Sequence, residues 1–104
     1  MITERLTFRA RYGHGDELVG LLKESFKDLF PTQELKSARI YTDATGPMFS
    51  VAVEMDFEDM AAWMRMTAGD PDTYGSAQFQ EWFGRMTQVT EAGERQLLNT
   101  EVLR

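Results

Sequence analysis

Apolar and polar residues alternate in four parts of the chain and recur at helical spacing in the parts between them. Alternation is typical of a β-strand with one buried face, whereas apolar residues three and four positions apart indicate an amphipathic helix. The alternating parts predict strands at 2–11, 37–43, 48–55 and 95–103. The helical spacing predicts helices at 16–29 and 76–92, and another that follows Asp56 and ends before the break at 69–72.

Turn and cap residues support these boundaries. Pro31 disfavours helical geometry at the residue before it and so ends the first helix. Residues 43–47 have the composition of a turn, so the strands on either side form a hairpin. Asp56 is expected to cap the second helix, with Asp59 in a capping-box-like position, and Gly93 to end the last helix. The second helix is expected to bury Phe57, Met60, Ala61 and Met64.

The resulting element order, β-α-β-β-α-α-β, is that of a ferredoxin-like α+β domain. Right-handed crossovers place the helices on one face of a four-stranded antiparallel sheet with strand order 4-1-3-2. The whole chain, 1–104, is expected to form this one domain. Glu4 is the one charged residue in the otherwise apolar series of the first strand.

The other face of the predicted sheet has no helix to cover it. Its expected polar residues are Arg5, Arg9, Arg39, Tyr41, Ser50, Glu54, Asn99 and Glu101. The same face is expected to show apolar side chains at Met48, Ala52, Leu97 and Leu103. A face of such mixed character suits a partly enclosed cavity or an interface.

Composition and charge narrow the function classes. The chain has no Cys and one His, which excludes disulfide scaffolds, Cys-ligated zinc and thiol catalysis. A net charge of −6 disfavours nucleic acid as a partner. No apolar run approaches the roughly 18 residues that a membrane span needs, and the N-terminus lacks signal-peptide features, so a cytoplasmic location is expected. Neither a metal nor a cofactor is expected, because calcium-loop and phosphate-loop spacings are missing.

The segment Tyr12-Gly13-His14-Gly15 holds the one histidine, directly before the first predicted helix. The segment is interpreted as a tight turn with an exposed side chain. The alternative is a general base at the mouth of a pocket, because the ordinary pKa of histidine is roughly 6.5. His14, Tyr41 and Arg39 are therefore the candidate catalytic residues.

Charged residues on the uncovered face allow two interpretations. Glu54 and Glu101 would lie on the strands that flank the first one, which carries Arg5 and Arg9. Opposite charges in such positions form a structural ion-pair network, here at a dimer interface. The alternative is recognition of an acidic or phenolic ligand by one unpaired arginine. The candidate ligand-binding residues are Arg9, Arg39, Tyr41, Glu54, Trp63 and Trp82.

The aromatic residues around the interrupted helix are mostly expected in the core. Trp82 and Phe83 are adjacent, so their directions differ by about 100° on a helix. One of the two is therefore expected to line a pocket or an interface. The break at 69–75 is interpreted as a mobile lid over that pocket or as an ordinary surface loop.

The element order and the stretch from Phe79-Gln80-Glu81-Trp82-Phe83 to Glu94-Arg95-Gln96-Leu97-Leu98 resemble the dimeric α/β-barrel superfamily. That group includes antibiotic-biosynthesis monooxygenases, haem-degrading monooxygenases, stress-responsive barrel proteins and NIPSNAP-like proteins. The resemblance implies a homodimer with a pocket between sheet and helices in each subunit. A haem-degrading member would have a histidine on a helix and an asparagine on the first strand, in addition to a tryptophan such as Trp63. This chain lacks that histidine and that asparagine.

Three functions stay open at this point. One is binding of a small aromatic or acidic molecule, and another is cofactor-independent monooxygenation or isomerisation by a chain that resembles the antibiotic-biosynthesis type. In the enzyme, Arg9, Arg39 or Tyr41 would orient the substrate and Trp82 would stack on it. The third is a purely structural dimer. The first two predict a cavity of roughly 300 Å3 or more beside Tyr41 and an arginine.

Overall fold

The fold is that of a computed structural model, in which residues 1–68 and 71–103 are described. The strands are β1 (Ile2–Ala10), β2 (Ser37–Thr42), β3 (Ser50–Phe57) and β4 (Thr90–Asn99). The helices are α1 (Gly15–Glu24), the π-helical turn η1 (Ser25–Leu29), α2 (Met60–Thr67), α3 (Pro71–Tyr74) and α4 (Ala77–Val89). Of the predicted break, Gly69 and Asp70 lie outside the described residues, and α3 follows them.

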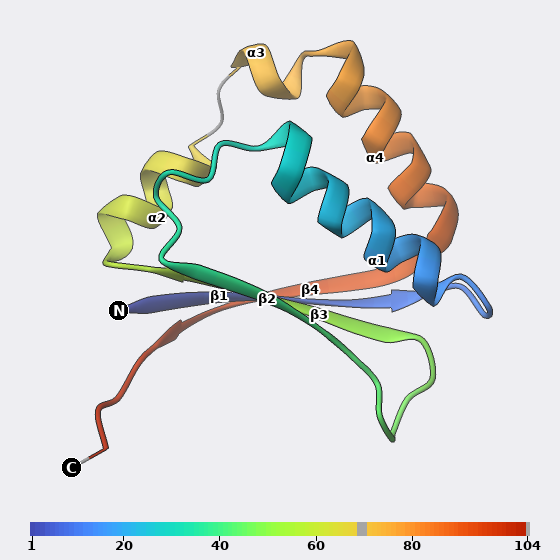
Figure 1. The fold of residues 1–104 in the computed structure, drawn as a ribbon, viewed down its shortest axis with the longest axis horizontal. Coiled ribbons are helices and arrows are strands. Elements are labelled where there is room, and N and C mark those ends of the chain that lie inside the picture. Colours follow the sequence, from blue (N-terminus) through green and yellow to red (C-terminus); the bar gives the residue numbers. More distant parts are fainter. Residues whose placement is uncertain (69–70, 104) are drawn as a thin grey trace.

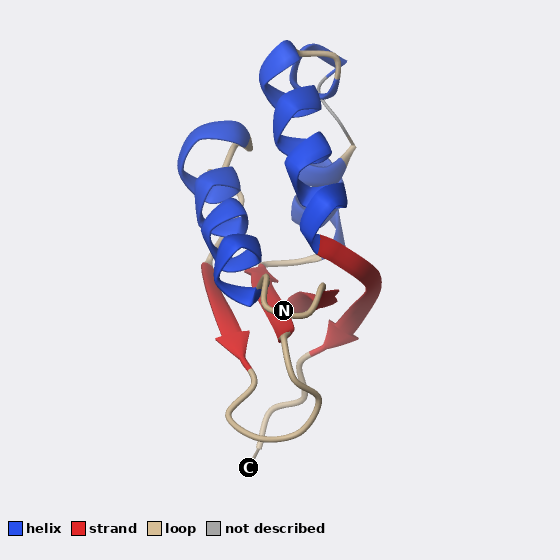
Figure 2. Cartoon of the chain, turned by 90° about the vertical axis from the view of Figure 1, so that its right-hand side faces the viewer, coloured by secondary structure: helices blue, strands red, loops and turns tan. Residues whose placement is uncertain are grey.

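The four strands form an antiparallel sheet in the order β2-β3-β1-β4. The helices lie on one face of this sheet, and the chain after β4 leaves on the opposite side (Figure 1). Viewed from the end of the sheet, α1 and α4 stand side by side on its covered face (Figure 2). The structure therefore confirms the ferredoxin-like α+β arrangement and the strand order predicted from the sequence.

The core fills the space between the covered face and the helices. Its most buried side chains come from α1 and β3, and they are Leu18, Val51, Val53 and Phe57. Trp82, Met86 and Val89 close the core from α4. Periodic apolar residues on both kinds of element thus meet as their spacing predicted.

The second helix begins later than predicted. Asp59 is its cap, because the Asp59 side chain accepts a hydrogen bond from the Ala62 backbone N–H at 2.9 Å. Asp56 is instead the penultimate residue of β3. The shifted start turns the helix on its axis, so Ala62 is buried while Met60 and Met64 are 43% and 57% exposed. The predicted stripe was therefore wrong at both methionines, and also at Ala61, which is exposed.

The last strand was placed too late in the sequence. α4 runs from Val89 directly into β4 without a turn, so Gly93 does not end a helix. Gly93 lies within β4 opposite Phe8, and a Cβ atom on it would be 3.0 Å from Phe8 Cδ1. A larger residue there would press on the ring of Phe8.

The register of β4 reverses the faces predicted for it. Gln96 pairs with Arg5, and Leu98 pairs with Thr3, so these two β4 side chains share the uncovered face. Leu97 and Asn99 belong to the covered face, contrary to prediction. Glu101 and Leu103 follow the end of the strand and belong to neither face.

The first predicted helix changes geometry before it ends. α1 stops at Glu24, and η1 continues it with a wider turn, in which the Phe30 N–H donates to the Ser25 carbonyl at 3.0 Å. Phe30 itself is extended, as expected for a residue before proline. π-helical turns are frequent at functional sites, and this one borders a cavity.

Candidate functional site

A cavity of about 270 Å3 lies between the covered face of the sheet and the helices. Its walls are mostly apolar and come from β1, β3, β4, α1, η1, α2, α3 and α4. The lining residues are Glu4, Leu6, Leu22, Ser25, Phe26, Phe30, Val53, Met55, Met66, Thr67, Tyr74, Trp82 and Arg95. A mostly apolar hollow with a few polar groups is the usual form of a small-molecule site.

Glu4 is the acidic group of this cavity. Its side chain lies on the covered face of β1, between Met55 and Leu97 of the neighbouring strands, and the residue is only 4% exposed. Trp63 Nε1 donates a hydrogen bond to Glu4 Oε2 at 2.8 Å. Within the described part of the chain, no other hydrogen bond reaches this carboxyl group. A buried carboxylate with one donor has unused capacity to accept hydrogen bonds.

Arg95 is the basic group of the same cavity. It lies on the covered face of β4, opposite Leu6, and is exposed on its outer side. Leu97, two residues further, faces Glu4, so Glu4 and Arg95 are diagonal neighbours on one sheet face. Among residues 1–68 and 71–103, Arg95 has no ion-pair partner.

Aromatic rings form the wall opposite the sheet. The ring centroids of Phe30 and Trp82 are 5.8 Å apart and nearly perpendicular, and Tyr74 lies 6.0 Å from Phe30. Trp82 Nε1 donates to the Leu21 carbonyl at 2.8 Å, which anchors α4 to α1. The indole therefore presents its apolar surface to the cavity rather than a free donor.

The ligand-binding residues predicted from the sequence do not lie together. Trp82 lines the cavity, and Trp63 holds Glu4 beside it. Arg39, Tyr41 and Glu54 lie on the opposite face of the sheet, as does Arg9. The cavity expected beside Tyr41 is therefore on the other side of the sheet, and its arginine is Arg95.

The uncovered face carries a connected charge network. Arg39 bridges two carboxylates, with Nη1 at 2.8 Å from Asp56 Oδ2 and Nη2 at 2.9 Å from Glu54 Oε1. Arg5 Nη2 approaches Glu54 Oε2 at 2.7 Å from the other side. Arg39 Nε also donates to the Tyr41 hydroxyl at 2.9 Å. Part of the predicted network exists: Glu54 pairs with Arg5 and Arg39. Asp56 of β3 is its second carboxylate, and among the described residues neither Arg9 nor Glu101 pairs with these groups.

The network is held in its charged form. The Arg39 guanidinium, helped by the hydroxyls of Ser37 and Thr3, holds the pKa of the Asp56 carboxyl far below its ordinary value. Hydrogen bonds first from Arg5 and then from Arg39 lower the pKa of Glu54. The charges of this cluster compensate one another, so it presents no unpaired arginine to a ligand.

Arg9 and His14 belong neither to the lining of the cavity nor to the charge network. Arg9 is exposed and has Glu91 Oε2 at 3.5 Å from its Nε. His14 lies directly before α1, and its Nδ1 is 3.0 Å from Glu17 Oε1. Neither residue lines the cavity.

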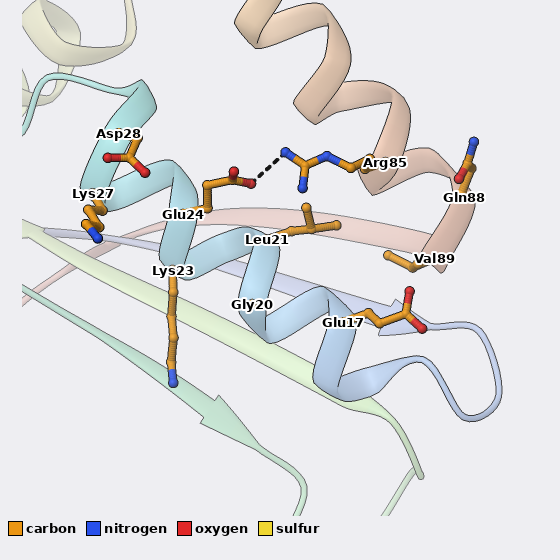
Figure 3. A pocket seen from close by; sticks show the side chains of 10 residues that line it. All are labelled: Glu17, Gly20, Leu21, Lys23, Glu24, Lys27, Asp28, Arg85, Gln88 and Val89. Atoms are coloured by element: carbon orange, nitrogen blue, oxygen red, sulfur yellow. Dashed lines mark hydrogen bonds and ion pairs between the residues drawn. The ribbon is translucent and has the colours of Figure 1, made fainter.

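A larger hollow of about 660 Å3 is a surface groove between α1 and α4 (Figure 3). Leu21 and Val89 contribute apolar surface to it, and an ion pair of 2.8 Å between Arg85 and Glu24 spans it. The groove is wide open, so a ligand there would stay largely in water. The smaller cavity is the better candidate because it is lined by buried side chains, including Glu4.

Sequence reasoning did not select Glu4 and Arg95. The signal for Glu4 was present, since it interrupts an apolar series in β1. No comparable signal marked Arg95, because the start of β4 was misplaced. In the described ranges, no three His, Asp or Glu side chains form a group that could hold a metal ion. No helix in these ranges is long and apolar enough to cross a membrane.

Solved structures share this fold over the whole chain. A NIPSNAP-like domain protein from Burkholderia xenovorans superposes with a TM-score of 0.78 at 13% identity, covering 99% of this chain and 87% of that one. A NIPSNAP domain protein from the same organism superposes with a TM-score of 0.73 at 17% identity, covering 100% of this chain and 98% of that one. A mutant form of SnoaB, a cofactor-independent oxygenase from Streptomyces nogalater, superposes with a TM-score of 0.69 at 12% identity. The superposition covers 98% of this chain and 94% of that one.

At identities below 25%, these similarities show a shared fold. The protein has the fold of NIPSNAP domain proteins and of antibiotic-biosynthesis monooxygenases. No protein-family model and no curated protein matches the sequence. Because a shared fold does not fix chemistry, function has to be argued from the cavity itself.

Proposed function

We propose that the protein binds a small molecule with an aromatic ring system in the cavity between sheet and helices. The observation that carries this proposal is an apolar cavity of about 270 Å3 with the buried carboxyl group of Glu4 in its wall. At the packing density of about 0.75 found in organic crystals, such a cavity has room for about 200 Å3 of ligand. That volume suits a molecule of two or three fused rings.

Binding of two-ring compounds tests the proposal. Isothermal calorimetry with 2-naphthol and 2-naphthoate should give saturable binding with one site per chain. Met66→Trp places a larger side chain in the cavity wall and should abolish binding. Met64→Trp is the matched control, because Met64 lies on the same helix but is exposed and does not line the cavity. Equal binding by the two variants would place the site elsewhere.

Catalysis in the same cavity is the second candidate. A buried carboxylate can act as a general base, and proton removal from an acidic C–H is a first step shared by isomerisation and cofactor-independent oxygenation. The fold shared with SnoaB adds support from outside the chain. Oxygen uptake with an electron-rich phenol tests the oxygenase, and Glu4→Gln should then reduce turnover while the fold persists. The candidate catalytic roles of Arg39, Tyr41 and His14 stay predictions.

We also propose that two copies associate through their uncovered sheet faces. The face combines the charge network with Tyr41, Ala52 and Leu98 and has no helix over it. Its six charged side chains carry three positive and three negative charges, from Arg5, Arg9, Arg39, Glu54, Asp56 and Glu94. A face with balanced charges can meet a second copy without net repulsion. If the protein dimerises yet binds nothing, the purely structural dimer is favoured. The cytoplasmic location stays a prediction.

A further inference from the structure

We infer that the ligand of the cavity presents a hydrogen-bond donor to Glu4 and an anionic group to Arg95. The inference rests on the proposed function, because it concerns the same cavity. It goes beyond that function by defining the ligand as a ring system with a hydroxyl or N–H at one end and an acid at the other. Glu4 and Arg95 are then the residues that determine specificity.

The donor requirement follows from the surroundings of Glu4. The residue is only 4% exposed, it lies among Leu6, Met55 and other apolar side chains, and only Trp63 among the described residues donates to its carboxyl group. Burial of a carboxyl group with spare acceptor positions is unfavourable unless a donor fills them. A ligand hydroxyl or N–H in the cavity would supply that donor.

The anion requirement follows from Arg95. This guanidinium borders the cavity, and it pairs with no acidic side chain among the described residues. The other arginines near the helices are engaged, since Arg65 binds Glu34 and Arg85 binds Glu24. An arginine with free donors beside an apolar hollow is suited to bind a carboxylate.

The spacing of the two residues orients the ligand. As diagonal neighbours on one sheet face, the two residues are expected roughly 7–8 Å apart. Glu4 is buried on a central strand, whereas Arg95 is exposed on the edge strand β4. The ligand would therefore enter with its donor end first and leave its acid end near the solvent.

Matched two-ring compounds test this inference. Four ligands are compared by calorimetry: 6-hydroxy-2-naphthoate, 6-methoxy-2-naphthoate, 2-naphthoate and 2-naphthol. We expect the hydroxy acid to bind at least about tenfold more tightly than either acid without the hydroxyl, since a hydrogen bond to a charged group has this effect. Glu4→Gln should remove that advantage and should favour the methoxy compound, because the amide can donate as well as accept.

The variants separate the two ends of the ligand. Arg95→Gln should weaken the three acids about tenfold or more and leave 2-naphthol unchanged. Arg11→Gln is the control for loss of one positive charge, because Arg11 is exposed and does not line the cavity. The comparison of ligands on the unaltered protein keeps the test valid even if Glu4→Gln fails to fold.

The outcomes distinguish the inference from the proposed function. If all four compounds bind with similar affinity, cavity binding stands and the donor and anion requirements are both wrong. If the acids bind Arg95→Gln and the unaltered protein equally, the anion requirement is wrong. If none of the four binds, the proposed function fails and the inference fails with it.

Discussion

Glu4 and Trp63 are 59 positions apart in the sequence and meet in one hydrogen bond, from Trp63 Nε1 to Glu4 Oε2 at 2.8 Å. The bond ties β1 at the centre of the sheet to α2 at the edge of the helical layer. Because the carboxyl group is buried, the bond both fastens α2 and satisfies a polar group beside the cavity.

Replacement of either partner should therefore destabilise the protein. Trp63→Phe leaves the buried Glu4 without its donor and should lower the free energy of unfolding by about 1–3 kcal/mol. Glu4→Leu should leave the indole N–H unpaired at a similar cost, whereas the double variant should lose less than the sum. Urea unfolding of the four proteins measures this coupling. Strictly additive losses would show that the bond does not couple the residues.

The charge network on the uncovered face predicts an acid dependence. The pKa of Asp56 is held far below its ordinary value, chiefly by Arg39, and that of Glu54 is also lowered, chiefly by Arg5. A depressed folded-state pKa stabilises the fold above the unfolded-state pKa, and this contribution disappears as the pH falls toward the folded-state value. The free energy of unfolding should thus decline below about pH 4.

Asp56→Asn provides the test of that decline. At neutral pH the variant should be less stable by about 1–3 kcal/mol, because Arg39, Ser37 and Thr3 lose a charged acceptor. Between about pH 5 and pH 3 its stability should fall less steeply than that of the unaltered protein. Parallel pH profiles, measured by thermal unfolding, would show that Asp56 does not carry the effect.

If two copies associate through the uncovered face, a large side chain at the centre of that face should prevent the association. Ala52 of β3 lies between Thr7 and Tyr41 on that face, so Ala52→Arg should hold two copies apart. Light scattering after gel filtration should then give the mass of a monomer, against a dimer for the unaltered protein. Ala61→Arg is the matched control, because Ala61 is exposed on α2, away from this face. This variant should remain dimeric. A dimeric Ala52→Arg protein would exclude this face as the interface.

Replacement of a glycine by alanine should have opposite effects on stability at Gly93, which contacts Phe8, and at Gly84, which has open space around it. Gly93→Ala brings a Cβ to 3.0 Å from Phe8 Cδ1 and 3.2 Å from Cε1, and should destabilise the protein by about 1–3 kcal/mol. Gly84→Ala meets no atom within 4 Å and lies inside α4, so it should stabilise the protein by up to about 1 kcal/mol. Chemical unfolding measures both, and equal effects would contradict the steric explanation.

Periodicity predicted the fold well where an element buries one face. The alternation in β1 and β3 placed Arg5 and Glu54 on the same face, and they form an ion pair there. The spacing of leucines in α1 identified its buried side, with Leu18 and Leu22 in the core. Such patterns are reliable because burial on one face constrains every second or every third to fourth residue.

The prediction was wrong where neighbouring elements join without a turn. Val89 and Thr90 connect α4 to β4 directly, so no Gly or Pro marked the boundary, and the faces of β4 were assigned from a late start. That error hid Arg95. The start of α2 was misplaced for a different reason. Asp56 and Asp59 are both suitable caps, and only the contacts of each side chain show that Asp59 is the one that caps α2.

The wide turn η1 shows how a cavity of this kind can change during evolution. A π-helical turn differs from an α-helical one by one additional residue per turn, so loss of one residue from Ser25–Leu29 would restore regular α geometry. The residues on either side would keep their orientation, whereas the side chains within the turn would change, and Ser25 and Phe26 of this turn line the cavity. Relatives with different ligands can therefore be expected to differ in the length of this helix as well as in the identity of the residues that line the cavity.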